Sequence, residues 1–271
     1  MALVLDQKRY CSDHARIRLG THEVEATCMP VLQKFSSHSL TEQLAVNLAD
    51  RTDSKYLMPI RALSRFLQAL IEDHTVLQSA EHRIFTYENT YFDTPGWDMY
   101  LRHHNGKLNR RKLRFRRYHE TDISYLEVKL KNNKQRTVKT RILWDDEKSV
   151  DVPTLNAQME ARLYVNYRRI TLWNRLTDER LTLDYDLHFL RPGQGKAVQL
   201  SKYFIAEIKR EGKVYGSSFF RNAKNYGFTP LPISKYCVGV CLTDSGELKR
   251  NRFKPLLKKL SEPQHSGELV G

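Results

Sequence analysis

The stretch "RRKLRFRRY", residues 110–118, combines six cations with two apolar side chains. In an extended strand, alternate side chains point to opposite faces, so Lys112, Arg114 and Arg116 share one face and the apolar pair lies on the other. In a helix, Lys112 would stand one turn from Arg116, and like charges at this spacing repel. The stretch therefore predicts a β-strand with one basic face and one apolar face.

The same alternation of apolar and charged residues recurs along the chain. A short turn-like sequence, "LKNNKQR" (130–136), joins two of these stretches and favours an antiparallel hairpin. Helical patterns occupy 59–70, 216–227 and 245–260. Counting the opening stretch, the pattern predicts about eight strands; the others are 51–59, 124–131, 136–144, 161–173, 179–190, 202–210 and 232–240.

The charged faces of these strands are mostly cationic, with a few carboxylates between the cations. In 179–190, the alternation assigns Asp184, Asp186 and His188 to the charged face together with Arg180. A flat sheet with one solvated face would explain the alternation alone. A closed barrel with a polar interior also accounts for the accompanying helices. We therefore predict an α+β fold, an antiparallel β-barrel tunnel of about eight strands with helices packed outside.

The composition points to a polyanionic partner. The 271 residues include 45 Lys and Arg against 31 Asp and Glu, a net charge of +14. Such an excess suits nucleic acid, an anionic membrane surface or a phosphate-rich small molecule. The sequence lacks both an apolar run of roughly 20 residues and a signal peptide, and its four cysteines form no CxxC pair. We expect a cytoplasmic protein that could still associate with a membrane through a protein partner.

A tunnel lined with cations is unfavourable when it is empty. Two like charges about 4 Å apart repel by roughly 4 kcal/mol at an effective dielectric of 20. A bound polyanion reverses this cost, and the planar fork of arginine suits phosphate oxygens. A carboxylate on the same face, such as Glu207, could hold Mg²⁺ or Mn²⁺ against the phosphates.

Seven short motifs carry a resemblance to a known family. They resemble, in order, the motifs of VTC-type polyphosphate polymerase domains, within the triphosphate tunnel metalloenzyme (CYTH-like) superfamily. The resemblance divides the chain into an N-terminal arm or short helices (1–47), a tunnel domain (48–242) and a basic C-terminal helix or tail (243–271). The motifs are "DSKYLMP", "YENTYFDT", "KLRFRRY", "LEVKLK", "YRR", "AEIKREG" and "PISKY".

The resemblance implies an activity and a set of site residues. Such domains transfer the γ-phosphate of ATP or another nucleoside triphosphate to a growing inorganic polyphosphate chain, with Mn²⁺ or Mg²⁺. Glu207 would be the metal ligand, and Glu127 falls on the same predicted face. The catalytic phosphate-binding residues would be Lys55, Arg114, Arg116, Lys129, Lys139, Arg169 and Lys235. Further substrate contacts would come from Tyr167, Arg180, Ser234, Arg141 and Lys209.

Two other functions remain open from the sequence. An inorganic triphosphatase or nucleotide phosphohydrolase could use the same tunnel, but hydrolytic relatives tend to begin the first strand with ExExK, whereas this chain has "RTDSK" at 51–55. A nucleic-acid-binding protein could stack bases on Phe115, Tyr118 and Tyr125. No RNP signature or zinc finger is present, and carboxylates on the basic faces would repel a nucleic-acid backbone. We therefore favour the polymerase and expect no nucleic-acid partner.

Overall fold

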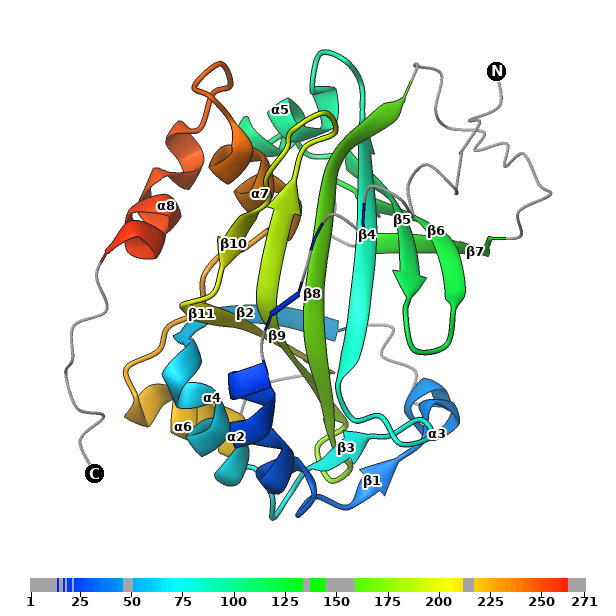
Figure 1. Cartoon of the computed structure of the whole chain (residues 1–271), viewed down its shortest axis with the longest axis vertical. Helices are drawn as coiled ribbons and strands as arrows, with labels where there is room; N and C mark the ends of the chain where they lie inside the picture. Colours follow the sequence, from blue (N-terminus) through cyan, green and yellow to red (C-terminus); the bar gives the residue numbers. More distant parts are fainter. Residues whose placement is uncertain are drawn as a thin grey trace.

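An antiparallel sheet organises the chain (Figure 1). The computed structural model describes residues 14, 17, 19–20, 22–45, 51–133, 137–144, 159–211 and 217–262. Eight strands pair in the order β2-β11-β9-β8-β4-β5-β6-β7. Their bounds are β2 Arg51–Pro59, β4 Phe85–Asp93, β5 Arg110–Tyr118, β6 Ile123–Lys131, β7 Thr137–Leu143, β8 Glu160–Asn174, β9 Glu179–Leu190 and β11 Tyr203–Glu211.

Short strands and helices complete the architecture. The short strands are β1 (Ser37–His38), β3 (Thr75–Leu77) and β10 (Val198–Leu200), and β1 pairs with β3 in parallel. In Figure 1, α2, α4 and α6 gather at one end of the sheet, and α5, α7 and α8 lie at the other. No helix of the described segments is long and apolar enough to cross a membrane. The helices are α2 His22–Leu32, α3 Leu40–Ala45, α4 Leu63–Gln68, α5 Asp98–His104, α6 Ser218–Asn225, α7 Lys235–Thr243 and α8 Lys254–Ser261, with 3₁₀ turns η1 Ile60–Ala62 and η2 Asn251–Phe253.

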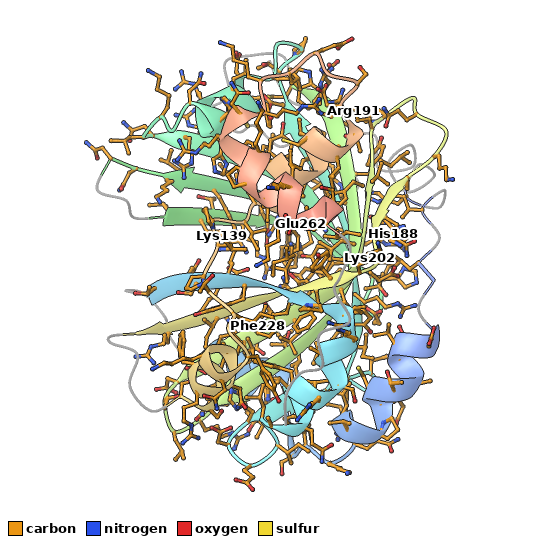
Figure 2. The ribbon with its side chains drawn as sticks, turned by 90° about the vertical axis from the view of Figure 1, so that its left-hand side faces the viewer. Lys139, His188, Arg191, Lys202, Phe228 and Glu262 are labelled. Atoms are coloured by element: carbon orange, nitrogen blue, oxygen red, sulfur yellow. The ribbon has the colours of Figure 1, made fainter. Side chains whose placement is uncertain are left out.

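The sheet curls so that strands far apart in the pairing order face one another. Lys129 on β6 and Glu207 on β11 are close enough for each charge to shift the pKa of the other, although β9, β8, β4 and β5 separate the two strands in the sheet. Between the described parts of the edge strands β2 and β7 there is no pairing, so hydrogen bonds do not close the ring there. Figure 2 looks onto these two edges, with Lys139 labelled between them. The predicted antiparallel, tunnel-like α+β fold is confirmed.

Apolar side chains fill both sides of the curled sheet. On the outer side, Leu183 and Tyr185 of β9 belong to a buried cluster with Phe66 and Leu67 of α4. On the inner side, Phe189 belongs to a second cluster with residues of α7, and side chains of α8 pack against it. Helix α7 therefore fills one part of the concave face, and charged side chains remain in the rest.

One predicted strand is a helix, and one observed strand was not predicted. The prediction of a strand at 232–240 is wrong, because helix α7 begins at Lys235. The Ser234 side chain caps this helix by accepting a hydrogen bond from the amide of Cys237. Helix α7 is buried on nearly all sides and lacks an amphipathic period. Strand β4 was not predicted for a similar reason. It is central in the sheet and covered on both faces, so its sequence does not alternate between apolar and polar residues.

The other strand predictions are confirmed, and the three helix predictions are confirmed in part. The seven remaining strand stretches all coincide with observed strands, including the opening stretch, which is β5. Helices occupy the centres of 59–70 and 216–227. In 245–260, the chain becomes helical only from η2 onward, and α8 starts at Lys254 with Pro255 in its first turn.

A β-bulge reverses which side chains of β9 point inward in the second half of the strand. Asp186 has a left-handed backbone (φ 51°), and the register between β8 and β9 shifts between Asn166 and Arg168. His188 consequently lies opposite Asn166, whose side chain contacts His14, rather than on the face of Asp184. The prediction that Asp186 and His188 share the charged inner face is therefore wrong. The two instead form a hydrogen bond of 2.8 Å with each other.

Candidate functional site: the basic inner face

Charged side chains from seven strands and α7 line the part of the concave face that α7 leaves open. In each strand they occupy alternate positions, so strand periodicity alone points them to one side. We call this surface the basic inner face. Its members are Lys55, Lys112, Arg114, Arg116, Glu127, Lys129, Lys139, Arg141, Tyr167, Arg169, Asp184, Glu207, Lys209 and Lys235.

Glu127 is the centre of the first cluster of charges. Its side chain is fully buried on β6 and lies 2.7 Å from Nε of Arg114, 2.6 Å from Nζ of Lys139 and 3.2 Å from Nε of Arg141. Burial raises the pKa of Glu127, but the charges of Arg114, Arg116 and Lys139 outweigh burial and hold the pKa well below its usual range. Glu127 therefore stays ionised and fixes three cations.

Asp184 on β9 holds a second cluster. Its carboxylate accepts two hydrogen bonds from Arg169 on β8, at 2.5 and 2.8 Å, and one from Lys235 at the start of α7. Burial opposes ionisation, yet Arg169 and Lys235 lower the pKa of Asp184 to about 2. Asp184 thus ties α7 to the sheet through a side chain of the basic inner face.

Glu207 on β11 forms the third cluster. Its carboxylate lies 2.9 Å from Nζ of Lys209 and 3.5 Å from Nζ of Lys55 on the neighbouring strand β2. Burial raises the pKa of Glu207, and the charges of Lys209, Lys55, Lys235 and Lys129 more than reverse this effect, so the pKa lies well below its ordinary value.

Three further cations have no carboxylate partner. Within the described ranges, no carboxylate oxygen lies within 4.0 Å of the charged nitrogens of Lys112, Arg116 or Lys129. Lys112 donates to Oγ of Ser234 at 2.8 Å, and burial lowers the pKa of both lysines. A buried cation without a counter-charge is costly. These three side chains therefore suit an anionic ligand.

Aromatic rings and an amide hold the guanidinium groups in place. Arg116 donates to Oδ1 of Asn89 and to the hydroxyl of Tyr167, both at 2.8 Å. Tyr87 stacks on Tyr167 with 5.3 Å between ring centroids, and the guanidinium carbons of Arg116 and Arg169 lie 4.9 and 4.7 Å from the Tyr87 centroid. The arginines are thus oriented before any ligand binds.

The structure brings together the residues that the sequence nominated. All seven cations of the proposed catalytic set lie on the basic inner face, with Arg141, Tyr167, Lys209 and Glu207. Ser234 caps α7 beside Lys112, and Arg180 lies opposite Lys209 at the start of β9. The sequence did not nominate Lys112 or Asp184, although strand alternation places both on the charged face. The motif "YENTYFDT" contains Tyr87 and Asn89, but neither residue was given a role, because the alternation did not predict β4.

Glu207 is the least buried of the three carboxylates on the basic inner face, with 12% of its side chain exposed and none of Glu127 or Asp184. The described residues contain no group of three or more His, Cys, Asp or Glu side chains that could hold a metal ion by themselves. Mg²⁺ is commonly bound by one or two carboxylates together with substrate phosphates. Glu207, beside the cations that would hold those phosphates, fits this mode of binding.

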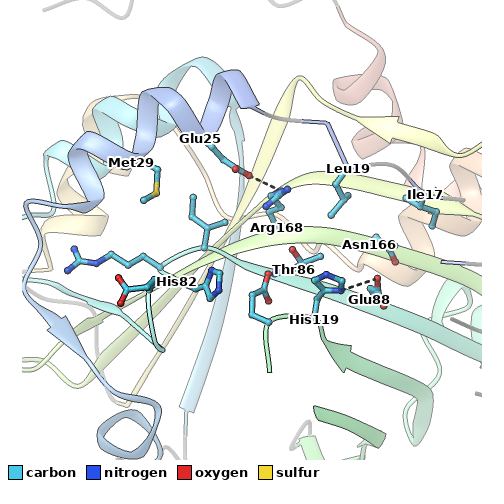
Figure 3. A pocket seen from close by; sticks show the side chains of 14 residues that line it. Ile17, Leu19, Glu25, Met29, His82, Thr86, Glu88, His119, Asn166 and Arg168 are labelled. Atoms are coloured by element: carbon cyan, nitrogen blue, oxygen red, sulfur yellow. Dashed lines mark hydrogen bonds and ion pairs between the residues drawn. The ribbon is translucent and has the colours of Figure 1, made fainter. Parts of the chain in front are cut away.

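A cavity of about 760 Å³ lies elsewhere, on the outer face of the sheet (Figure 3). It is lined by side chains of both charges, with an ion pair between Glu25 and Arg168 (2.8 Å) and a contact of 3.8 Å between Oε1 of Glu88 and Nδ1 of His119. No residue of the basic inner face lines it. The size of this cavity therefore does not make it the candidate site, because the uncompensated cations lie on the other face.

Comparisons with solved structures identify partial likenesses at low identity. A candidate adenylate cyclase from Vibrio parahaemolyticus is 16% identical, with a TM-score of 0.44 over 69% of this chain and 97% of that chain. A candidate adenylyl cyclase from Hippeastrum, described as having a dominant triphosphatase activity, is 12% identical, with a TM-score of 0.43 over 72% and 97%. The protein PH1819 from Pyrococcus horikoshii is 16% identical, with a TM-score of 0.41 over 69% and 97%.

The comparison with protein families is more specific. No curated protein sequence matches the chain. The segment that does match a family model contains strands β2 to β7, with Lys55 and the cations of β5, β6 and β7. Residues 50–157 match the VTC domain family, and the resemblance inferred from the motifs is confirmed over this segment.

Proposed function

We propose that this protein is a polyphosphate polymerase that transfers the γ-phosphate of ATP to a growing inorganic polyphosphate chain on the basic inner face. The observation that carries the proposal is a set of buried or half-buried cations without a carboxylate partner among the described residues, Lys112, Arg116 and Lys129, within a segment that matches the VTC domain. A polyphosphate or triphosphate supplies the missing negative charge.

In the proposed mechanism, the protein orients the phosphates and neutralises their charge. Arg116 and Arg114 present fixed donors to phosphate oxygens, and Lys129 adds a charge from the adjacent strand. Developing charge on the transferred phosphoryl group is stabilised by donors that are already in place. The terminal phosphate of the acceptor chain is ionised at neutral pH, so this transfer needs no strong general base.

A divalent metal completes the proposal. Glu207 would hold Mg²⁺ or Mn²⁺ together with phosphate oxygens, and the bound ion would supply further charge neutralisation for the phosphates. Lys209 and Lys55 keep the Glu207 carboxylate ionised at the place where the metal would bind.

The runner-up is hydrolysis of triphosphate in the same site. Hydrolysis needs a group that positions and activates water. The buried carboxylates of the described inner face are poor candidates, because Glu127 and Asp184 are each held by cations and their pKa values are lowered. This arrangement favours transfer to a phosphate acceptor over transfer to water.

The test is an incubation of purified protein with γ-labelled ATP and Mn²⁺, resolved on a gel. We expect a ladder of phosphate chains from the wild type, its loss in Lys129→Ala and Arg116→Ala, and its retention in Arg221→Ala on the exposed surface of α6. Free orthophosphate without a ladder would assign the site to the hydrolase. If neither product forms and ATP does not bind, the proposal is wrong.

A further inference from the structure

The line of cations continues beyond the proposed site. Arg110 and Lys131 lie opposite each other on β5 and β6, one step along the same face from the pair formed by Lys112 and Lys129. Because side chains two residues apart on a strand share a face, the β5–β6 hairpin presents its positive charges as a ladder. From Arg116 to Arg110 this ladder extends over six residues, or about 20 Å of strand.

Arg252, from η2, joins the end of the ladder. The Arg252 guanidinium packs closely against Gly106, because a Cβ added to this glycine would lie 2.5 Å from Nη1 of Arg252. Gly106 follows α5 and has a positive φ. Arg110 contacts the same turn, since its Nη1 donates to the carbonyl of Lys107 at 3.2 Å. Two guanidinium groups from distant parts of the chain thus meet over one turn. We call Arg110, Lys131 and Arg252 the outer basic corner.

No described carboxylate compensates these charges. Within the described ranges, no ion pair forms at Arg110, Lys131 or Arg252, and burial together with the charge of Arg252 lowers the pKa of Arg110. Beneath them, burial and the charges of Lys112, Arg110, Arg252 and Lys131 lower the pKa of His103 to about 2. The positive charge of these residues therefore acts on its neighbours without a described carboxylate to offset it.

We propose that the outer basic corner binds the polyphosphate chain beyond the phosphates held on the basic inner face. This inference rests on the proposed function, because it assumes that the inner face holds phosphates. The ladder is longer than three linked phosphates, and its end lies on residues that are only partly buried or exposed. A linear polyanion with a charge on every unit suits the length and the sign of this ladder.

The test compares long and short anions on the double variant Arg110→Gln/Arg252→Gln. Titration calorimetry with long-chain polyphosphate, tripolyphosphate and ATP needs no turnover, so it is independent of the polymerase assay. We expect the affinity for the long chain to fall at least tenfold, while the affinities for tripolyphosphate and ATP change less than twofold. The matched control is Arg221→Gln/Lys224→Gln on α6, at the opposite end of the molecule, which removes the same charge from exposed positions.

Several results would overturn the inference. One is an equal loss in the control, which would reflect net charge alone. Another is a wild type that binds the long chain no better than tripolyphosphate. A third is an oligonucleotide that binds the wild type as tightly as polyphosphate does and whose binding the same double variant abolishes. This result would make the corner a general polyanion surface. Selective long-chain binding in a protein that makes no polyphosphate would support the corner and reject the polymerase.

Discussion

At the scale of single residues, three carboxylates hold seven of the cations of the inner face. Each was predictable in position, since strand alternation places Glu127, Asp184 and Glu207 on the charged face. Their partners were less predictable, because Glu127 binds side chains of β5 and β7 and Asp184 binds one from α7. A sequence pattern gives the face of a side chain and leaves its neighbour across the sheet undetermined.

The burial of Glu127 leads to a prediction about stability. Glu127→Gln removes the counter-charge of Arg114, Lys139 and Arg141 at once, so we expect the free energy of unfolding to fall by about 3–5 kcal/mol. Urea denaturation at pH 7 measures the change. Asp122→Asn is the control, because its ion pair with Arg117 is exposed and should contribute less than about 1 kcal/mol. Equal effects in the two variants would contradict the role given to Glu127.

The titration of Lys139 gives a prediction for ligand binding. Burial, with the charges of Arg114 and Arg141, lowers the pKa of Lys139 to about 8, although Glu127 opposes the shift. Phosphate prefers the protonated lysine, so the affinity for tripolyphosphate should fall as the pH rises above 8, by up to about tenfold per pH unit. Lys139→Arg keeps its proton and should flatten this decline between pH 8 and 9.5, measured by calorimetry. A variant with the same profile as the wild type would exclude Lys139 from the binding site.

At the scale of elements, the positions where periodicity failed are the ones that shape the site. Strand β4 supplies Tyr87 and Asn89, and it lacks a regular pattern because both of its faces are covered. Helix α7 carries Lys235 inward, and its buried sequence has no polar side. The bulge at Asp186 exchanges the inward and outward positions of β9. Each is a tertiary effect that overrides a local pattern.

The close approach of α7 to the sheet gives a prediction at this scale. A Cβ on Gly239 would stand 2.4 Å from Phe189 and 2.7 Å from Leu163, so Gly239→Ala should push α7 away from the sheet. Alanine favours an exposed helix by about 1 kcal/mol relative to glycine. Here we expect the opposite sign, a loss of about 1–3 kcal/mol in the free energy of unfolding. Gly195→Ala, with open space around its Cβ, is the control in the same urea titration. A stabilised Gly239→Ala would show that α7 is not held this closely.

At the scale of the whole molecule, the curl of the sheet determines which charges meet. Lys129 and Glu207 shift the pKa of each other, although four strands separate β6 from β11 in the pairing order. The alternation within a single strand cannot predict such a contact between distant strands. The sequence predicted seven of the eight long strands, their antiparallel pairing and a basic interior. The motif resemblance, rather than the alternation, identified which cations would lie together, because a family pattern carries long-range geometry that a local pattern lacks.

The same curvature predicts a conflict between stability and ligand binding. Burial and the charge of Arg114 lower the pKa of Lys129 well below its ordinary value, although Glu207 opposes the shift. No carboxylate oxygen of the described residues lies within 4.0 Å of its Nζ, so the charge of Lys129 destabilises the fold when no anion is bound. Lys129→Met should therefore raise the free energy of unfolding at pH 7 by about 1–2 kcal/mol while it weakens tripolyphosphate binding. Lys235→Met removes a partner of Asp184 and should lower the free energy of unfolding by about 1–3 kcal/mol.

The pH dependence distinguishes this conflict from a simple packing gain. A lysine whose pKa is lowered by folding destabilises the protein most when the pH lies below both of its pKa values. Raising the pH toward the unfolded value of about 10.4 removes this penalty, so the stability gap between Lys129→Met and the wild type should narrow. Urea titrations at pH 7 and pH 9.5 measure the gap. A gap that stays constant would attribute the gain to the methionine side chain, and a destabilised Lys129→Met would mean that the ligand-free face tolerates its charges without cost.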